Sequence, residues 1–154
     1  MIARVDTASR VVAASAQAIY NAFVDPDCQA RWLSSTGMTA RFDRFEPYPG
    51  GRYRMVLTYA DGGAAHPGKS AFDADIAEGC FLVLDPASRI VQTADFISDD
   101  PAFAGTMTIE WMLVSVADGT RVTVAARDVP PGISAEDHVA GLTSTLANLA
   151  EFVE

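Results

Sequence analysis

Hydrophobic and polar residues alternate through most of the middle of the chain, and a period of two predicts half-buried β-strands. In residues 52–59, for example, Tyr53, Met55 and Leu57 alternate with mostly polar neighbours. Seven segments of this kind are expected to form strands, over residues 5–13, 38–43, 52–59, 70–84, 89–97, 107–113 and 122–126. Gly79 interrupts the longest of them, which predicts a β-bulge at that position.

Three other segments carry a helical pattern. At the C-terminal end, apolar residues recur every three or four positions, as Val139, Leu142, Leu146, Leu149 and Val153. Ser134 and Asp137 have the spacing of a capping box, so this helix is expected to span residues 134–154. Two short helices are expected earlier, over residues 16–24 and 27–33, and Pro26 separates them.

The long terminal helix must bury its apolar stripe, and the predicted sheet offers the only large apolar surface for it. The pattern therefore predicts an α+β fold. A curved antiparallel sheet of about seven strands wraps the long C-terminal helix, and two short helices follow the first strand. With 154 residues, the chain has the length of one domain, and we expect a single domain over residues 1–154.

Charge narrows the choice of partners. The chain has 20 Asp and Glu against 11 Lys and Arg, which gives a formal net charge of -9. Such a surface repels phosphate backbones and anionic lipids, so we expect binding neither to nucleic acid nor to membranes. No apolar run is long enough to span a bilayer, and the N-terminus does not resemble a secretion signal, so we expect a cytoplasmic protein with Cys28 and Cys80 as reduced thiols.

A helix held against a curved sheet commonly leaves room for a ligand. The alternation on four strands predicts an apolar cavity wall of Tyr53, Met55, Phe72, Ile76, Phe96, Met107, Ile109 and Trp111. Trp32 is expected near the mouth of the cavity, and Leu142 is expected to project into it from the terminal helix. Packing of the core is the alternative role for these large side chains.

Two polar residues fall on the predicted inward faces. Gln92 shares a face with Ile90, Ala94 and Phe96, and its amide needs a hydrogen-bond partner from the ligand or from the protein. Glu78 follows Ile76 on the same face, where a carboxylate could act as an acid or base; a position at the rim in water is the alternative. We identify no catalytic residues, no metal-ligand spacing and no cofactor motif.

Taken together in order and spacing, several motifs resemble the START-like, or SRPBCC, superfamily with its helix-grip fold. They are the terminal helix and the segments 18–23 (AIYNAF), 30–33 (ARWL), 49–53 (PGGRY), 85–91 (DPASRIV) and 119–123 (GTRVT). The branch that the chain resembles most is that of the homologues of the activator of the heat-shock chaperone ATPase. Where many relatives have tryptophan after the glycine of the terminal helix, this chain has Leu142 after Gly141, which would enlarge the cavity.

The resemblance implies an apolar cavity, used by relatives for lipids, sterols, polyketides or hormones. Three functions follow as hypotheses. The first is a carrier or sensor that binds a small apolar molecule, and the second is a cyclase or hydro-lyase that uses a carboxylate of the cavity. The third is a module that interacts with a chaperone. A homodimer is a further alternative among the partners.

Overall fold

The computed structural model describes residues 4–33, 38–59, 74–98 and 100–154. Within them the strands are β1 (Val5–Val12), β2 (Met38–Phe45), β3 (Arg52–Tyr59), β4 (Ala74–Asp85), β5 (Arg89–Phe96), β6 (Met107–Val116) and β7 (Gly119–Arg127). The helices are α1 (Ala16–Val24), α2 (Pro26–Leu33), α3 (Ala135–Val153) and the short 3-10 helix η1 (Pro101–Phe103). The predicted order of elements is confirmed.

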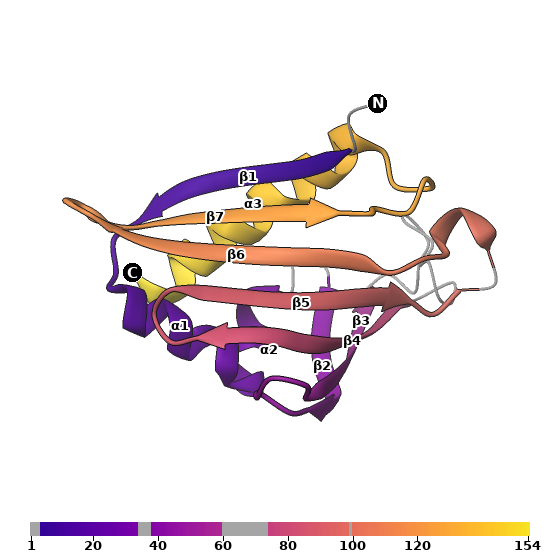
Figure 1. The fold of residues 1–154 in the computed structure, drawn as a ribbon, viewed down its shortest axis with the longest axis horizontal. Coiled ribbons are helices and arrows are strands. Elements are labelled where there is room, and N and C mark those ends of the chain that lie inside the picture. The colour runs from indigo at the N-terminus through magenta and orange to yellow at the C-terminus, as the bar shows by residue number, and fades with distance from the viewer. Residues whose placement is uncertain (1–3, 34–37, 60–73, 99) are drawn as a thin grey trace.

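The strands form one antiparallel sheet in the order β1-β7-β6-β5-β4-β3-β2. In Figure 1, α3 crosses behind the strands. Helices α1 and α2 lie at the end of the sheet near the C-terminus. Helix α3 packs along β1 and also contacts α1 and α2. This arrangement confirms the predicted α+β helix-grip fold.

Local sequence signals begin the helices where they were expected. The Ser134 hydroxyl accepts a hydrogen bond from the Asp137 backbone N–H at 3.1 Å, and Ser15 does the same for Ala18 at 3.1 Å. Helix α2 starts at Pro26, one residue earlier than predicted, because proline fits the first helical position. No helix in the described part of the chain is long and apolar enough to cross a membrane.

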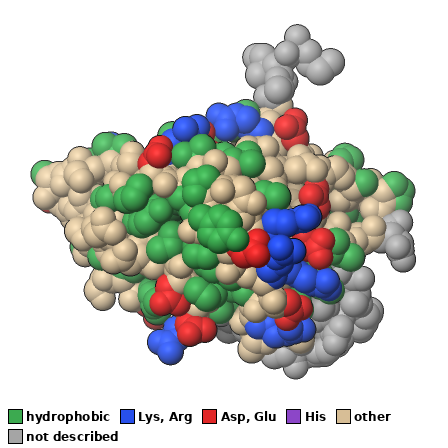
Figure 2. Space-filling view, turned by 60° about the horizontal axis from the view of Figure 1, so that its bottom comes forward, with side chains coloured by type: hydrophobic (Ala, Val, Ile, Leu, Met, Phe, Trp, Pro, Cys, Tyr) green, Lys and Arg blue, Asp and Glu red, His purple; other side chains and the backbone are tan. Residues whose placement is uncertain are grey.

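Ion pairs cover part of the outer face of the sheet. Arg54 lies 3.6 Å from Asp43 and 3.3 Å from Glu78, and Arg89 and Arg127 both contact Glu110. In the view of Figure 2, Arg side chains accordingly lie beside Asp and Glu side chains. The arginines of this face are therefore largely neutralised by neighbouring carboxylates.

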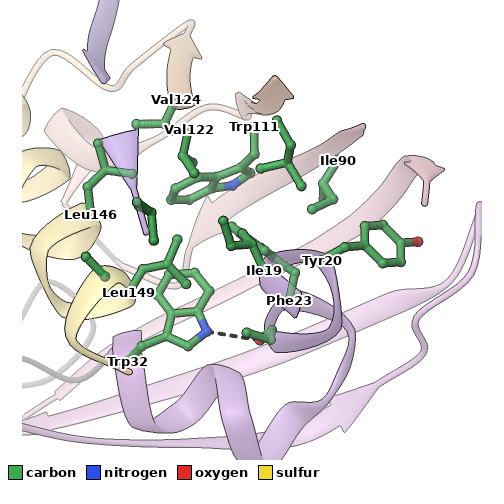
Figure 3. Packing of buried hydrophobic residues seen from close by; sticks show 14 of the residues in the cluster. Ile19, Tyr20, Phe23, Trp32, Ile90, Trp111, Val122, Val124, Leu146 and Leu149 are labelled. Carbon is green, nitrogen blue, oxygen red and sulfur yellow. Dashed lines mark hydrogen bonds between the residues drawn. The ribbon is translucent and has the colours of Figure 1, made fainter. Parts of the chain in front are cut away.

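The main core lies between α3, the α1–α2 pair and strands β5 to β7. Phe23, Trp32 and Trp111 pack edge to face there, with ring centroids 4.8 to 5.9 Å apart. Figure 3 shows these rings together with Leu146 and Leu149 of α3. The stripe predicted on the terminal helix is thus buried at Leu142, Leu146 and Leu149.

The bulge predicted at Gly79 is wrong. The register between β4 and β5 shifts between Phe81 and Val83 instead. Gly79 has a different role, because a Cβ at this position would lie 1.8 Å from the Thr93 carbonyl oxygen. Glycine is needed there to let β4 and β5 come this close together.

Candidate ligand cavity

A cavity of about 290 Å³ lies between the concave face of the sheet and helices α2 and α3. Most of its wall is apolar, and it is supplied by β2 to β6 and both helices. Eight of the residues predicted to contact a ligand lie on this wall: Tyr53, Met55, Gln92, Phe96, Met107, Ile109, Trp111 and Leu142. That they contact a ligand stays a prediction. Phe72, also predicted for the wall, lies outside the described residues.

The predicted inward face of β4 is wrong. Pairing with β3 sets Met55 opposite Ala77 and Leu57 opposite Asp75, so Asp75 and Ala77 line the cavity. Side chains of neighbouring residues in a strand point to opposite faces, and Ile76 and Glu78 are therefore excluded from the wall. Glu78 instead pairs with Arg54 on the outer face. Among the described residues of the wall, the carboxylate is that of Asp75, which is only 5% exposed.

Trp32 does not stand at the mouth of the cavity. Its side chain is 1% exposed, and its indole Nε1 donates to the Ala22 carbonyl oxygen at 3.0 Å. Figure 3 shows this hydrogen bond within the core. From the same helix, Gln29 and Leu33 reach the cavity instead.

A hydrogen-bond network orients the Gln92 side chain. The Tyr53 hydroxyl donates its proton to the Thr93 carbonyl oxygen, so it can only accept from Gln92 Nε2, which lies 3.1 Å away. This assigns the amide: Nε2 faces Tyr53, and Oε1 faces away from it. Gln92 Oε1 is buried and has no hydrogen-bond partner among the described residues. Burial also raises the pKa of Tyr53 to about 12, which keeps the phenol neutral.

Two further polar atoms of the wall, as far as the structure describes it, are buried without a hydrogen-bond partner, namely Gln29 Oε1 and Trp111 Nε1. Gln29 is 4% exposed, and Trp111 is buried as well. A buried polar atom without a hydrogen bond costs free energy, on the order of 1–3 kcal/mol. The cavity therefore presents polar atoms that a bound molecule or a water could satisfy.

His138 was not predicted as a site residue, yet it lines the cavity. Its Nδ1 lies 2.7 Å from Asp6 Oδ2. Arg4 holds the same carboxylate through Nε at 3.0 Å and Nη2 at 2.8 Å. The sequence did contain a signal for His138, because it precedes Leu142 by four residues and so shares its helix face.

Asp6 is 3% exposed, and its carboxyl is ionised in this setting. The hydrogen bond from Arg4 lowers the pKa of Asp6, burial opposes this effect, and the hydrogen bond to His138 adds to the lowering. In the described part of the chain, no three His, Cys, Asp or Glu side chains come together as a metal site.

A family model described as "Activator of Hsp90 ATPase homolog 1-like protein" matches residues 13–154. A crystal structure of a protein from Chromobacterium violaceum is 27% identical, with a TM-score of 0.86, and the match covers 97% of this chain and 96% of the other. An AHSA1-like protein from Aeromonas hydrophila, determined by NMR in solution, is 22% identical with a TM-score of 0.73, covering 97% and 92%. A Rhodobacter sphaeroides protein is 20% identical, with a TM-score of 0.76, covering 94% and 88%. Below 25% identity such likenesses indicate the fold alone. No curated protein matches the chain.

Proposed function

The chain belongs to the family of Activator of Hsp90 ATPase homolog 1-like proteins, and we propose that within this family it binds a small, largely apolar molecule as a carrier or sensor. The observation that carries this proposal is the cavity behind α3. Its volume of about 290 Å³ is close to the lower end of small-molecule sites, and its wall combines apolar side chains with a few polar atoms.

The unpaired polar atoms favour a cavity that holds a ligand over a cavity that stays empty. If the wall residues served only to stabilise the fold, apolar side chains in place of Gln29 and Gln92 would make the fold more stable. Both amides lie on the inside, and neither Oε1 has a partner in the described part of the chain. A bound molecule with a matching group would recover the free energy that their burial costs.

Binding can be measured with an uncharged hydrophobic dye such as Nile red, by following its emission and that of Trp111 on the cavity wall. We expect a saturable change at one site per chain. Met107→Trp should weaken binding at least tenfold, because the larger side chain fills the cavity. The matched control is Met112→Trp on the same strand, since Met112 does not line the cavity.

Three outcomes would count against the carrier: no saturable binding, binding unchanged in Met107→Trp, or equal weakening in the control. In the first case, interaction with a chaperone becomes the better hypothesis, and adding the protein to Hsp90 while following ATP hydrolysis would test it. Native mass spectrometry of the freshly purified protein should reveal a co-purified small molecule if the carrier holds its ligand tightly.

One observation favours a second candidate, an enzyme of the cyclase or hydro-lyase type. Asp75 places a carboxylate on the wall of the cavity, where it could exchange a proton with a bound substrate. A turnover role predicts that Asp75→Asn still binds the co-purified molecule but no longer converts it, as followed by mass spectrometry. A pure carrier leaves the molecule unchanged in both proteins.

A further inference from the structure

A second hollow, open to the outside of the molecule, borders the cavity. A groove of about 380 Å³ lies between the end of β5, η1 and the first turns of α3. Cavity and groove share three lining residues, Phe96, His138 and Gly141. A Cβ added at Gly141 would meet nothing within 4 Å, so the helix leaves open space at this point. His138 therefore lies at the threshold between the groove and the cavity.

The hydrogen bond to Asp6 determines which nitrogen of neutral His138 carries the proton. An ionised carboxylate only accepts hydrogen bonds, so Nδ1 must be the donor to Asp6. Arg4 makes two hydrogen bonds to Asp6 and a third, from Nη2, to the Ile133 carbonyl oxygen at 2.7 Å. These contacts fix the ring, and they leave Nε2 as a bare acceptor on the side away from Asp6.

Acceptors also dominate the unpaired polar atoms deeper in the cavity. Gln29 Oε1 and Gln92 Oε1 are acceptors, and Trp111 Nε1 is the one donor among the buried, unpartnered atoms of the described wall. Asp75 adds a further oxygen-bearing group to this wall, and no Lys or Arg occurs among the described lining residues. Arg4, the nearby cation, already pairs with Asp6. An anion would thus enter a largely apolar space whose described wall offers no Lys or Arg as a counter-ion, which is costly.

We propose that the cavity takes uncharged apolar molecules that carry a hydroxyl group, that His138 Nε2 accepts the hydrogen bond from this hydroxyl at the threshold, and that the corresponding carboxylates are rejected. The inference rests on the proposed function, and it adds the chemical class of the ligand and the group that selects it. His138 is here a binding residue, positioned by Asp6 and Arg4.

Three probes with the same ring system test the proposal by isothermal titration calorimetry: 2-naphthol, naphthalene and 2-naphthoate. We expect 2-naphthol to bind about fivefold more tightly than naphthalene, the order of gain that one net hydrogen bond supplies. The carboxylate should bind at least about tenfold more weakly than 2-naphthol, because it brings a buried charge without a partner.

In His138→Leu, the preference for 2-naphthol over naphthalene should fall below about twofold, since the acceptor is removed. Glu136→Gln should retain the preference, because Glu136 is exposed in the same helical turn and does not line the cavity. NMR on the unmodified protein provides a measurement that does not depend on the folding of a variant. The imidazole ¹⁵N spectrum should show a protonated Nδ1 and a bare Nε2, and 2-naphthol but not naphthalene should shift the Nε2 resonance.

The proposal is overturned if 2-naphthoate binds most tightly, if 2-naphthol gains nothing over naphthalene, or if His138→Leu keeps the full preference. A spectrum with Nε2 protonated also overturns it. In each of these cases the proposed function stands as long as at least one of the three probes binds. If none of the three probes binds, the proposed function fails together with this inference.

Discussion

At the scale of single residues, a hydrogen-bond network of three side-chain and backbone groups orients polar atoms on the cavity wall. The Tyr53 hydroxyl links the Thr93 carbonyl to the Gln92 amide. Gly79 makes this possible, because any side chain there would collide with the Thr93 carbonyl and would lie 2.8 Å from the Tyr53 hydroxyl. The network holds Gln92 Oε1 in one orientation, and a ligand would meet a preorganised acceptor.

Tyr53 leads to a prediction on pH. Burial raises its pKa to about 12, above the value near 10 of an exposed tyrosine, so the folded chain holds this proton more tightly than the unfolded chain. The stabilising contribution is complete below pH 10 and is lost as pH rises from about 10 to about 12. We expect the free energy of unfolding to fall by about 2–3 kcal/mol more in the natural protein than in Tyr53→Phe over this window.

Urea denaturation at a series of pH values measures this difference. The other three tyrosines, Tyr20, Tyr48 and Tyr59, are present in both proteins, so the comparison isolates Tyr53. An equal alkaline loss in Tyr53→Phe would assign the pH dependence to other groups.

At the scale of elements, α3 is the part that closes the cavity and completes the core. Leu146 and Leu149 bury themselves against the core cluster, whereas Leu142, Thr145 and His138 face the cavity. One helix therefore contributes to two environments along its length. Its N-terminal half is also tied to β1 through Asp6 and Arg4.

We expect Leu146→Ala to lower the free energy of unfolding by about 2–5 kcal/mol, because the truncation removes buried apolar surface and leaves a void. Leu146 is 1% exposed. The neighbouring exposed residue provides the control, and Ser144→Ala should change stability by no more than about 0.5 kcal/mol. A loss below about 0.5 kcal/mol for Leu146→Ala in chemical denaturation would contradict the burial of this helix face.

At the scale of the whole molecule, the formal net charge of -9 leads to a prediction about polyanions. On the outer face of the sheet, Arg41, Arg44, Arg54, Arg89 and Arg127 each lie within 4 Å of a carboxylate oxygen. Their charge is therefore largely cancelled locally, and they do not combine into a basic patch.

We expect no binding to DNA, RNA or vesicles containing phosphatidylserine at physiological salt, because the net field repels phosphate groups. Gel shift and vesicle co-sedimentation at low and physiological salt check this. A salt-sensitive shift at micromolar protein would contradict the expectation and would indicate a cationic surface.

The sequence by itself determined the elements and most of the inward faces. Periods of two and of three to four residues reflect burial of one face, so they located seven strands and three helices before any contact was known. The inward positions of Tyr53, Gln92 and Met107 followed in the same way, because their strands alternate clearly. Ser134 marked the start of the terminal helix because capping is a contact within four residues.

Only the tertiary structure decided the rest. The inner face of β4 depends on pairing with β3, because a strand that reads Asp75, Ile76, Ala77 and Glu78 has no clear apolar side to set its phase. Trp32 packs in the core rather than at the mouth of the cavity, because its ring contacts Phe23 and Trp111. The contact of His138 with Asp6 joins residues 132 positions apart. Local patterns describe which side of an element is buried, but they do not specify which distant residue it meets.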